Sequence, residues 1–358
     1  MTHFKALIGL NMFCGIGSTR LNQLLHYFGK PENILNAPVN ELAQIPGIGL
    51  KIAEKISSLK EKDIDEEFDL AEKHKLKIIT IGDEDYPDSL KQIPDPPIVL
   101  YVKGALKSQD KSGIAIVGSR RASLYGLSCA EKFAYDLSGR GITIVSGLAR
   151  GIDTLAHQGA LKSGGRTIAV IGSGFNYLYP AENKKLAEEI SCNGAVISEF
   201  PINAKPLAQN FPRRNRLISG LSLGVLVVEA AKNSGALITA DCALEQGRDV
   251  FALPGKIDSP NSLGTNELIK QGAKLVSSAE DILEEFDIAA AAIPASGPSL
   301  SGSESQVYGL ISSQPLLMDE IVEKTGIGIT EISGLLLKLQ MHKLVRQLPG
   351  KQFIKVKA

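Results

Sequence analysis

The stretch GIAIVG, residues Gly113–Gly118, is a run of aliphatic residues that ends in glycine. Five similar runs follow it along the chain: ITIVSG (142–147), TIAVIG (167–172), AVISEF (195–200), GVLVVEA (224–230) and DVFALPG (249–255). A helical pattern of roughly a dozen residues follows most of these runs. Strands that are apolar on both faces and alternate with helices are typical of a parallel sheet covered on two sides. We therefore predict an α/β domain around a parallel sheet.

The composition along the sequence divides the chain into three folded regions and one linker. Residues 1–76 are predicted to form short helices broken by pairs of glycines, and residues 77–288 contain the alternating strands and helices. Residues 289–305, AAAAIPASGPSLSGSES, are rich in Ala, Ser, Gly and Pro, which predicts a flexible linker. Residues 306–358 form the last region.

Length and charge limit the class of protein. The chain has 358 residues, 44% of them hydrophobic, and its 39 lysines and arginines balance its 39 aspartates and glutamates. A neutral protein is not a polybasic coat for nucleic acid, so any anion site must come from local clustering. No apolar run reaches the ~20 residues that span a bilayer, and the N-terminus lacks the pattern of a signal peptide. Four scattered cysteines indicate reduced thiols rather than disulfides or a zinc site. We expect a cytoplasmic protein with no membrane partner.

Small and cationic residues follow the predicted strands. Ser119, Arg120 and Arg121 come after the first run, and LARGID follows the second. In a parallel sheet, ligands bind beyond the carboxyl ends of the strands, where free N–H groups at helix starts attract anions. We therefore predict a phosphate-binding rim along this edge of the sheet. The alternative is that these glycines and serines only shape turns.

Other common ligand sites find no support in the motifs. The GSG of residues 172–174 follows a strand but lacks the third glycine of a dinucleotide-binding turn, and no Walker loop is present. The five histidines are dispersed, and His157 lies on a predicted helix among small apolar residues, as a core histidine does. We predict no cofactor, no metal site and no catalytic residues.

Six motifs follow one another in the middle of the chain: IAIVGSRRASLYG, IVSGLARGIDTLAHQGAL, VIGSGFNYLYPAENKKL, QNFPRRNRLISGLS, EAAKNSGALITADCALEQGRDVFALPG and GTNELIKQGAKLV. Together, over about residues 114–283, they resemble the DNA-processing protein A family, also called the DprA/Smf family. The resemblance implies an extended Rossmann-like core in a cytoplasmic bacterial protein that binds single-stranded DNA and is not an enzyme. It further implies a homodimer that acts in natural transformation, where it protects incoming strands and loads the recombinase RecA.

The resemblance also implies which residues form the DNA pocket. They are Ser119, Arg120, Gly147, Gly172, Gly174, Lys184, Asn210, Phe211, Arg213, Arg216, Ser234 and Gly235. Lys184 is chosen over the adjacent Lys185, although either could face the pocket. The dimer contact of the family maps to residues 266–275, where Leu268, Ile269 and Leu275 are apolar. Each of these three is equally well explained as a core residue.

Three arginines, Arg213, Arg214 and Arg216, crowd together just ahead of the GVLVVEA run. At a helix start, guanidinium groups and the helix dipole both favour phosphate. Phe211 beside them offers a flat face on which a base can stack, worth ~1–3 kcal/mol per base. An arginine together with an aromatic ring suits a single strand better than a closed duplex. The alternative is that one or two of the arginines pair with an internal acid such as Glu199.

The two flanking regions resemble accessory domains of the family. IPGIGLKIAEKI, residues 45–56, is similar to a helix-hairpin-helix element in a sterile-alpha-motif-like domain, where packing and phosphate contact are both open roles. After the linker, amphipathic helices and a turn at Pro349 and Gly350 resemble a winged-helix domain. Its recognition helix, residues 329–341, carries few basic residues, so we expect protein contact or weak DNA binding rather than base readout.

An enzyme is the alternative function. Related Rossmann-like folds hydrolyse nucleotide phosphoribosyl bonds, and a phosphate-binding rim would serve them too. Such phosphoribohydrolases carry a Gly-Gly-x-Gly-Thr turn followed by a glutamate, whereas the equivalent stretch here, NSGALITAD (233–241), lacks both features. Glu229 remains as a possible carboxylate for this alternative.

Overall fold

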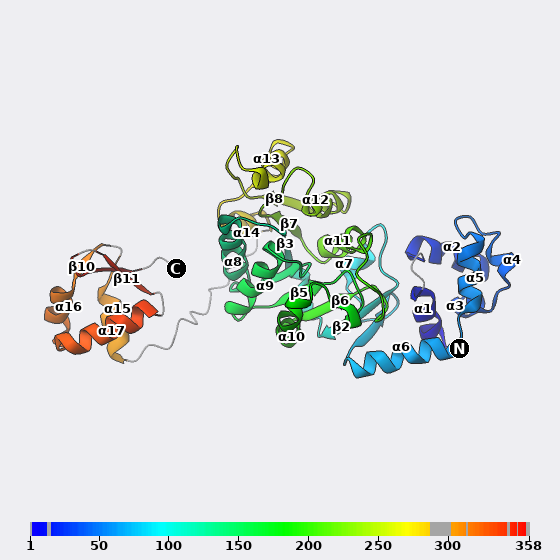
Figure 1. Cartoon of the computed structure of the whole chain (residues 1–358), viewed down its shortest axis with the longest axis horizontal. Coiled ribbons are helices and arrows are strands. Elements are labelled where there is room, and N and C mark those ends of the chain that lie inside the picture. The colour runs from blue at the N-terminus through cyan, green and yellow to red at the C-terminus, as the bar shows by residue number, and fades with distance from the viewer. Residues whose placement is uncertain are drawn as a thin grey trace. The chain divides into compact units, whose positions relative to one another are not determined.

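The computed structural model describes residues 2–12, 16–286, 302–312, 314–341, 344–348 and 350–355 (Figure 1). The chain forms two compact units, Met1–Ala292 and Ile293–Ala358. The first unit holds a helical N-terminal part and an α/β domain, and the second holds a small domain of helices and a three-stranded sheet. The linker predicted at 289–305 lies mainly outside the described residues, although helix α15 (Gly302–Leu310) begins within it.

The α/β domain is built on a sheet that, within the described residues, has nine strands in the order β1-β2-β6-β5-β4-β3-β7-β8-β9. The strands are β1 (Lys77–Thr80), β2 (Val99–Gly104), β3 (Gly113–Val117), β4 (Thr143–Ser146), β5 (Thr167–Val170), β6 (Ala195–Ser198), β7 (Gly224–Val227), β8 (Asp249–Ala252) and β9 (Lys274–Leu275). Strands β3 to β8 coincide with the six predicted runs, and they pair in parallel. Strands β1 and β2 add an antiparallel edge that the motifs did not predict. The predicted α/β fold with a parallel core is confirmed.

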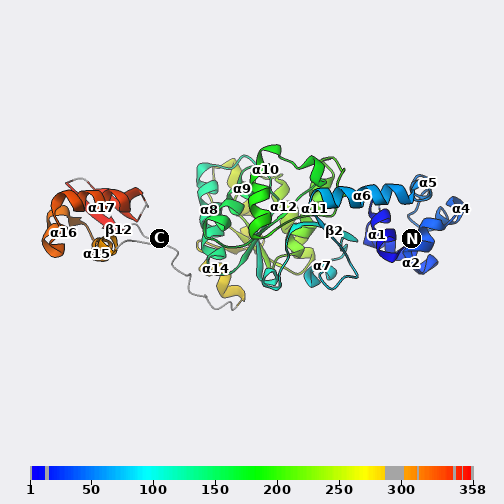
Figure 2. The same ribbon diagram turned by 90° about the horizontal axis from the view of Figure 1, so that it is seen from below.

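Helices cover both faces of this sheet (Figures 1 and 2). They are α7 (Asp88–Lys91), α8 (Leu124–Ser138), α9 (Ile152–Lys162), α10 (Lys184–Asn193), α11 (Asn210–Gly220), α12 (Gly235–Glu245), α13 (Leu263–Lys270) and α14 (Glu280–Leu283). In β3, Ala115 and Val117 face a core shared with α11 and α12, whereas Ile114 and Ile116 face a core shared with α8 and α9. Side chains of a strand alternate between its faces, so a run that is apolar throughout requires helices on both sides.

The sheet reverses its direction of growth at β3. From β3 the chain passes through α8 to β4 on one side, and β7 pairs with the other side of β3. The loops that follow β3 and β7 therefore lead away from each other and leave a crevice at the carboxyl edge of the sheet. Open α/β sheets bind ligands at such a point.

The N-terminal part is helical, as predicted. Its helices are α1 (His3–Asn11), α2 (Ser18–Phe28), α3 (Pro31–Asn36), α4 (Val39–Leu42), α5 (Leu50–Ser58) and α6 (Glu61–Lys73). The predicted hairpin joins α4 to α5, with Gly47 at a φ of 81° and Gly49 at the start of α5. This part packs on the antiparallel edge of the sheet, since its apolar core includes Val99 and Tyr101 of β2. It is also tied to the α/β domain by Asp95, whose carboxylate accepts the backbone N–H and the hydroxyl of Ser18 at 3.1 and 2.6 Å.

The second unit is the predicted winged-helix domain. It contains α15, α16 (Met318–Thr325), α17 (Ile329–Met341), β10 (Leu316–Leu317), β11 (Val345–Leu348) and β12 (Gln352–Lys355). The strands pair in the order β10-β12-β11, and α17 buries Leu336 and Leu339 against Val345 and Phe353. Helix α17 coincides with the predicted recognition helix. Of the predicted wing turn, Gly350 is described and Pro349 lies outside the described residues.

Candidate functional site

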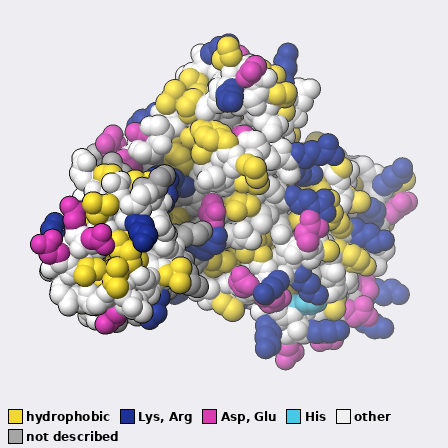
Figure 3. Space-filling model, turned by 60° about the vertical axis from the view of Figure 1, so that its left-hand side comes forward, with side chains coloured by type: hydrophobic (Ala, Val, Ile, Leu, Met, Phe, Trp, Pro, Cys, Tyr) yellow, Lys and Arg dark blue, Asp and Glu magenta, His cyan; other side chains and the backbone are white. Residues whose placement is uncertain are grey.

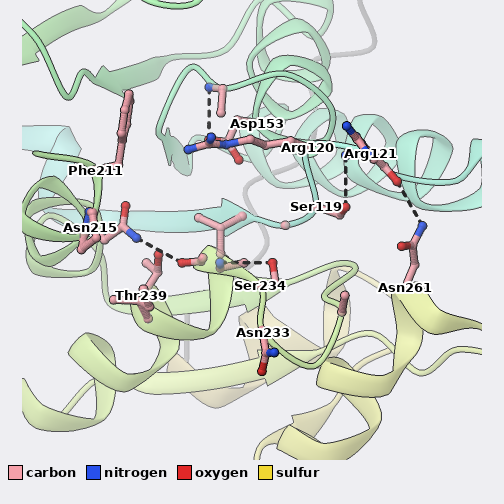
Figure 4. A pocket seen from close by; sticks show the side chains of 18 of the residues that line it. Ser119, Arg120, Arg121, Asp153, Phe211, Asn215, Asn233, Ser234, Thr239 and Asn261 are labelled. Atoms are coloured by element: carbon pink, nitrogen blue, oxygen red, sulfur yellow. Dashed lines mark hydrogen bonds between the residues drawn. The ribbon is translucent and has the colours of Figure 1, made fainter. Parts of the chain in front are cut away.

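A cavity of about 860 Å³, the main cleft, lies at the crevice between the loops after β3 and β7 (Figure 4). The β3 loop contributes Ser119, Arg120 and Arg121, and the β7 loop contributes the segment 231–235 at the start of α12. Phe211 comes from α11 across the cleft. The Ser119 hydroxyl accepts the N–H of Arg121 at 3.1 Å, which holds the two arginines in a tight turn. The predicted edge of the sheet is therefore hollow and lined by cations.

A smaller cavity of about 200 Å³, the side cavity, adjoins the main cleft and shares Arg120, Arg121 and Phe211 with it. The guanidinium of Arg120 lies 5.1 Å from the centre of the Phe211 ring. Tyr179 lines the side cavity, and its ring centre is 5.9 Å from that of Phe211. Arg150 completes the wall, 6.0 Å from the centre of the Tyr179 ring. Two arginine–aromatic pairs thus stand next to each other along the edge.

Positive charge predominates in the main cleft. Arg120, Arg121 and Lys232 are exposed and form no salt bridge with any described residue. Arg150 lines the side cavity, and both Oε atoms of Glu182, which lies outside the lining, accept hydrogen bonds from it. Over the face drawn in Figure 3, basic, acidic and hydrophobic side chains are mixed, in keeping with a net charge of zero. The cations of the cleft are therefore a local cluster, as the overall composition requires.

Among the described residues that line the main cleft, one is acidic: Asp153, whose carboxylate accepts hydrogen bonds from the protein backbone. Its carboxylate accepts the backbone N–H groups of Gly147 and Ala149 at 3.2 and 3.3 Å. Burial raises the pKa of this carboxyl, and the neighbouring Arg214 guanidinium opposes the shift. The amides of the loop after β4 are consequently occupied by an internal anion and do not face a ligand.

Arg214 is buried, lines the inner wall of the main cleft and holds the strand ends together. It donates to the carbonyl of Gly147 at 2.5 Å and to the carbonyl of Val170, which follow β4 and end β5 respectively. Burial lowers the pKa of its guanidinium to about 10, although Asp153 acts in the opposite direction. A side chain at Gly147 would overlap this guanidinium, so glycine is required there. Arg214 supports the site from within.

Arg213 and Arg216 do not line the cleft, contrary to the expectation from the sequence. Helix α11 begins at Asn210, so Arg213 ends its first turn and Arg216 lies in its second, and both pair with Glu199 at 3.2 and 2.6 Å. The Glu199 side chain is 1% exposed, and Asp95 lies 3.5 Å from Arg216 on the other side. Burial raises the pKa of Glu199, and the two arginines oppose that shift. The internal pairing that the sequence left open applies to both arginines.

Comparison with known proteins places the chain in a family. The model of the DNA recombination-mediator protein A family matches residues 77–287. The chain belongs to this family. The resemblance inferred from the motifs is thereby confirmed. Two further models match the flanking parts: a SAM-like helix-hairpin-helix tandem over residues 4–58 and the DprA winged helix domain over residues 291–351.

Relatives of the family agree over most of the chain. Protein Smf of Escherichia coli (strain K12) is 42% identical over 338 residues, which cover 92% of this chain and 89% of that protein. The solved structure of DNA processing protein A from Streptococcus pneumoniae superposes with a TM-score of 0.68 at 38% identity and covers 80% of this chain and 98% of that one. The Helicobacter pylori protein, solved to study its single-stranded DNA binding mode, gives a TM-score of 0.53 at 32% identity, covering 59% and 95%.

Of the family residues expected in the pocket, six line one of the two cavities. They are Ser119, Arg120, Gly147, Phe211, Ser234 and Gly235. Ser234 caps α12, since its hydroxyl accepts the N–H of Ala236 at 3.3 Å, and α12 thus starts at the wall of the main cleft. Arg120 and Phe211 belong to both cavities, which makes them the centre of the candidate site.

The other expected residues have structural surroundings of their own. A side chain at Gly172 would come within 2.9 Å of the Phe211 ring, so this glycine makes room for the aromatic. Gly174 packs against the backbone of Pro201 and Ile202. Asn210 is buried and donates to the carbonyl of Lys205, and Lys184 is exposed at the start of α10, outside both cavities. These four residues do not line either cavity.

Glu229 and His157, the two residues considered for a catalytic role, both form hydrogen bonds within the fold. Both carboxylate oxygens of Glu229 accept from Ser123, at 2.8 Å from its N–H and 2.5 Å from its hydroxyl, so Glu229 serves the start of α8. His157 is buried, and burial lowers the pKa of its imidazole to about 3. The Thr167 hydroxyl donates to the Ile144 carbonyl and therefore accepts the Nδ1–H of His157. The prediction of a core histidine is confirmed.

The described residues form neither a candidate metal site nor a helix suited to span a membrane. No group of three or more His, Cys, Asp or Glu is placed there to hold a metal ion. None of the helices in the described ranges has the length and apolar character needed to cross a membrane. Cys129, Cys192 and Cys242 are free thiols, and Cys14 lies outside the described residues.

Several lining residues were not among those that the resemblance assigned to the pocket. Arg121, Arg150 and Lys232 belong to loops after the predicted strands, where the phosphate-binding rim was expected, but they were not assigned to the pocket. Tyr179 was quoted within a motif without being assigned a role. Asn261, which donates to the Arg121 carbonyl at 3.1 Å, comes from a loop with no motif of its own (Figure 4).

Proposed function

We propose that the chain binds single-stranded DNA along the main cleft and the side cavity. The observation that carries the proposal is the pairing of Arg120 with Phe211 at 5.1 Å where the two cavities meet. Membership of the DNA recombination-mediator protein A family supports it, as does the single-stranded DNA binding described for the Helicobacter pylori relative.

The chemistry of the lining suits an unpaired strand. Arg120, Arg121 and Lys232 are available to phosphate oxygens, to which charged hydrogen bonds are the strong kind. Phe211 and Tyr179 present ring faces on which bases can stack. The bases of a duplex are already stacked and paired, so only a single strand can place a base on these rings while its phosphates meet the arginines. The α12 N-terminus adds a partial positive charge at the wall of the cleft.

The cellular role that follows is that of a binding protein. We propose that it covers incoming single strands in DNA processing during natural transformation and passes them to the recombinase RecA, without chemistry of its own. The engagement of Glu229 with Ser123 supports binding rather than phosphoribosyl hydrolysis, because that carboxylate is used within the fold.

A homodimer is part of the same proposal. Among the residues expected at the contact, Leu275 is 49% exposed, Ile269 is partly buried and Leu268 is 7% exposed within the core. Leu275 is therefore the most exposed of the three and the best placed to contact a second copy. Replacing Leu275 with aspartate should convert a dimer to a monomer in light scattering, and an unchanged mass would move the contact elsewhere.

The test of DNA binding is fluorescence anisotropy of a labelled dT20 across a salt series. Arg120→Ala should weaken binding about 10- to 100-fold, since a hydrogen bond to a charged group is worth about 1.5–3 kcal/mol. It should also reduce the slope of log affinity against log salt by ~0.7, the value for one phosphate of a single strand. Arg140→Ala is the matched control, because Arg140 pairs with Glu280 and lines neither cavity.

Equal binding by Arg120→Ala and wild type would contradict the proposed site. Absence of dT20 binding by the wild-type protein would contradict the proposed function itself. Release of base from nucleoside monophosphates by the same preparation would favour the phosphoribohydrolase alternative.

A further inference from the structure

A third cavity of about 850 Å³ opens beside the main cleft and has no role in the site described above. It lies between the start of α8 and the loop that follows β8. Its lining includes Leu124 and Tyr125 from α8, and Pro254, Lys256 and Ser259 from the loop. The cavity is as large as the main cleft, so it can hold a nucleotide-sized ligand.

The third cavity and the main cleft are bordered by the same two chain segments, although no residue lines both. Arg121 lines the main cleft and Ser123, two residues further on, lines the third cavity. On the opposite wall, Asn261 lines the main cleft while Ser259 and Ser262 line the third cavity. Within the described residues, one hydrogen bond links these two segments: the Asn261 side chain donates to the Arg121 carbonyl at 3.1 Å. A chain that fills the main cleft can therefore cross this low ridge and continue into the third cavity.

Apolar side chains are unusually exposed around this cavity. The exposed fractions are 55% for Tyr125, 87% for Leu124 and 90% for Ile257. Exposed aliphatic and aromatic groups gathered in one place mark a binding surface. An aromatic ring presented to solvent beside a cationic cleft is the arrangement on which bases of a single strand stack.

The positive charge of the cavity comes from a side chain and not from the helix. The start of α8 is closed, because the Ser123 hydroxyl accepts the N–H of Gly126 at 3.1 Å and Glu229 accepts from Ser123. Glu229 also lines the cavity, and both of its carboxylate oxygens accept hydrogen bonds from Ser123. Lys256 is exposed and forms no salt bridge with any described residue. Asp258 stands two residues further along the same loop but is not part of the lining. Lys256 is thus the group available for a phosphate.

We propose that the third cavity is a second base-stacking subsite, which takes single-stranded DNA leaving the main cleft across the Asn261 ridge. Tyr125 is the stacking platform, Leu124 contacts the sugar, and Lys256 binds a phosphate. The inference rests on the proposed function and extends it by a defined path: side cavity, main cleft, third cavity.

The chain contains no tryptophan, which gives this subsite a direct optical test. In Tyr125→Trp the new indole is the single tryptophan, and stacking by a base should quench its fluorescence when dT20 is added. Tyr135→Trp is the matched control, because Tyr135 lies on the same helix, is 40% exposed and lines none of the three cavities. Its fluorescence should not change.

Affinity measurements give the second readout. Tyr125→Ala should weaken dT20 binding roughly 5- to 100-fold, the range for loss of one stacked base, while Tyr125→Phe should bind like wild type. The main cleft contains more cations than the third cavity, so a short dT4 should occupy the main cleft alone. Tyr125→Ala should therefore weaken dT4 binding less than it weakens dT20 binding. Urea unfolding of each variant checks that the fold is retained.

The inference is overturned if Tyr125→Trp shows no quenching and Tyr125→Ala binds dT20 like wild type while Arg120→Ala has lost binding. In that case the proposed function stands and the apolar rim is a surface for a protein partner or a second copy. If Arg120→Ala also binds like wild type, the cleft itself is wrongly assigned and the subsite falls with it.

Discussion

Replacing Arg213 and Arg216 with alanine should destabilise the protein rather than remove a DNA contact. Both guanidinium groups pair with Glu199, whose side chain is 1% exposed, and neither lines the cavities. Removing one partner of a buried ion pair leaves an uncompensated charge and costs about 3–5 kcal/mol. The single Arg216→Ala change should cost about 3 kcal/mol, at the low end, because Arg213 stays 3.2 Å from the carboxylate.

The second arginine contributes less by itself. Arg213 is 32% exposed, so solvent screens its charge and Arg213→Ala should cost about 1 kcal/mol. The double variant leaves Glu199 with no cation and should lose about 5 kcal/mol, more than the sum of the two single changes. Adding Glu199→Gln to the double variant should restore part of the stability, because a neutral amide is less costly to bury.

Urea unfolding followed by circular dichroism measures these differences, and dT20 anisotropy at a temperature where each variant is folded measures binding. We expect lower unfolding midpoints with dT20 affinity within about threefold of wild type, since neither side chain faces the cleft. The reasoning is refuted if the double variant unfolds like wild type and yet loses dT20 binding to the extent of Arg120→Ala. The arginines would then face DNA, as the sequence alone suggested.

Three further substitutions test the packing behind the cleft. His157 has its pKa lowered to about 3 from 6.5, so the stability it contributes is full above pH 6.5 and is lost as pH falls towards 3; the loss at pH 5 is about 2 kcal/mol. His157→Leu should remove this slope from urea midpoints compared at pH 7 and 5, and an identical slope would exclude the buried neutral imidazole. Gly147→Ala should lower the melting temperature, because the added methyl group would overlap the Arg214 guanidinium at a cost of about 1–3 kcal/mol. An unchanged melting temperature would contradict this overlap. Ser123→Ala should lower the stability by about 1–2 kcal/mol in the same thermal unfolding experiment, because the N-cap of α8 is lost, whereas Ser123→Thr should retain most of that stability. Equal melting temperatures of the two variants would argue against the cap.

The sheet was predictable because its signal is local. The six runs that became β3 to β8 are apolar on both faces. A strand that is buried on both sides is a nearly continuous run of apolar residues, so it can be recognised from its own sequence. Arg120 was predictable for the same reason, since a residue just past a parallel strand must lie at the carboxyl edge. The antiparallel edge was missed although β2 belongs to an apolar run, residues 98–102, because no long helical stretch separates β2 from β1 or β3, and the run does not fit the alternating pattern. Its burial also depends on the helical N-terminal part, through contacts far apart in sequence.

The direction of the arginine cluster was harder to predict. Arg213 and Arg216 are three residues apart and share one face of α11, while Arg214 lies on another. Helical phase thus separates the cluster into two groups, but which group faces the cleft depends on how α11 packs on the sheet. Glu199 was recognised as a possible partner, yet only the fold brings its carboxylate within reach of both arginines. Loop residues such as Asn261 have no periodic pattern and cannot be placed from sequence.

The most direct test of the central claim is to find where a bound single strand touches the protein. An oligo-dT carrying one 5-iododeoxyuridine, crosslinked by ultraviolet light and mapped by mass spectrometry, marks the aromatic side chains that stack with its base. We predict crosslinks at Phe211 or Tyr179, the rings that line the side cavity beside Arg120 and Arg150. Crosslinks confined to the helix-hairpin-helix part or to the winged-helix unit, with none on these two rings, would contradict the claim that the carboxyl edge of the sheet holds the DNA.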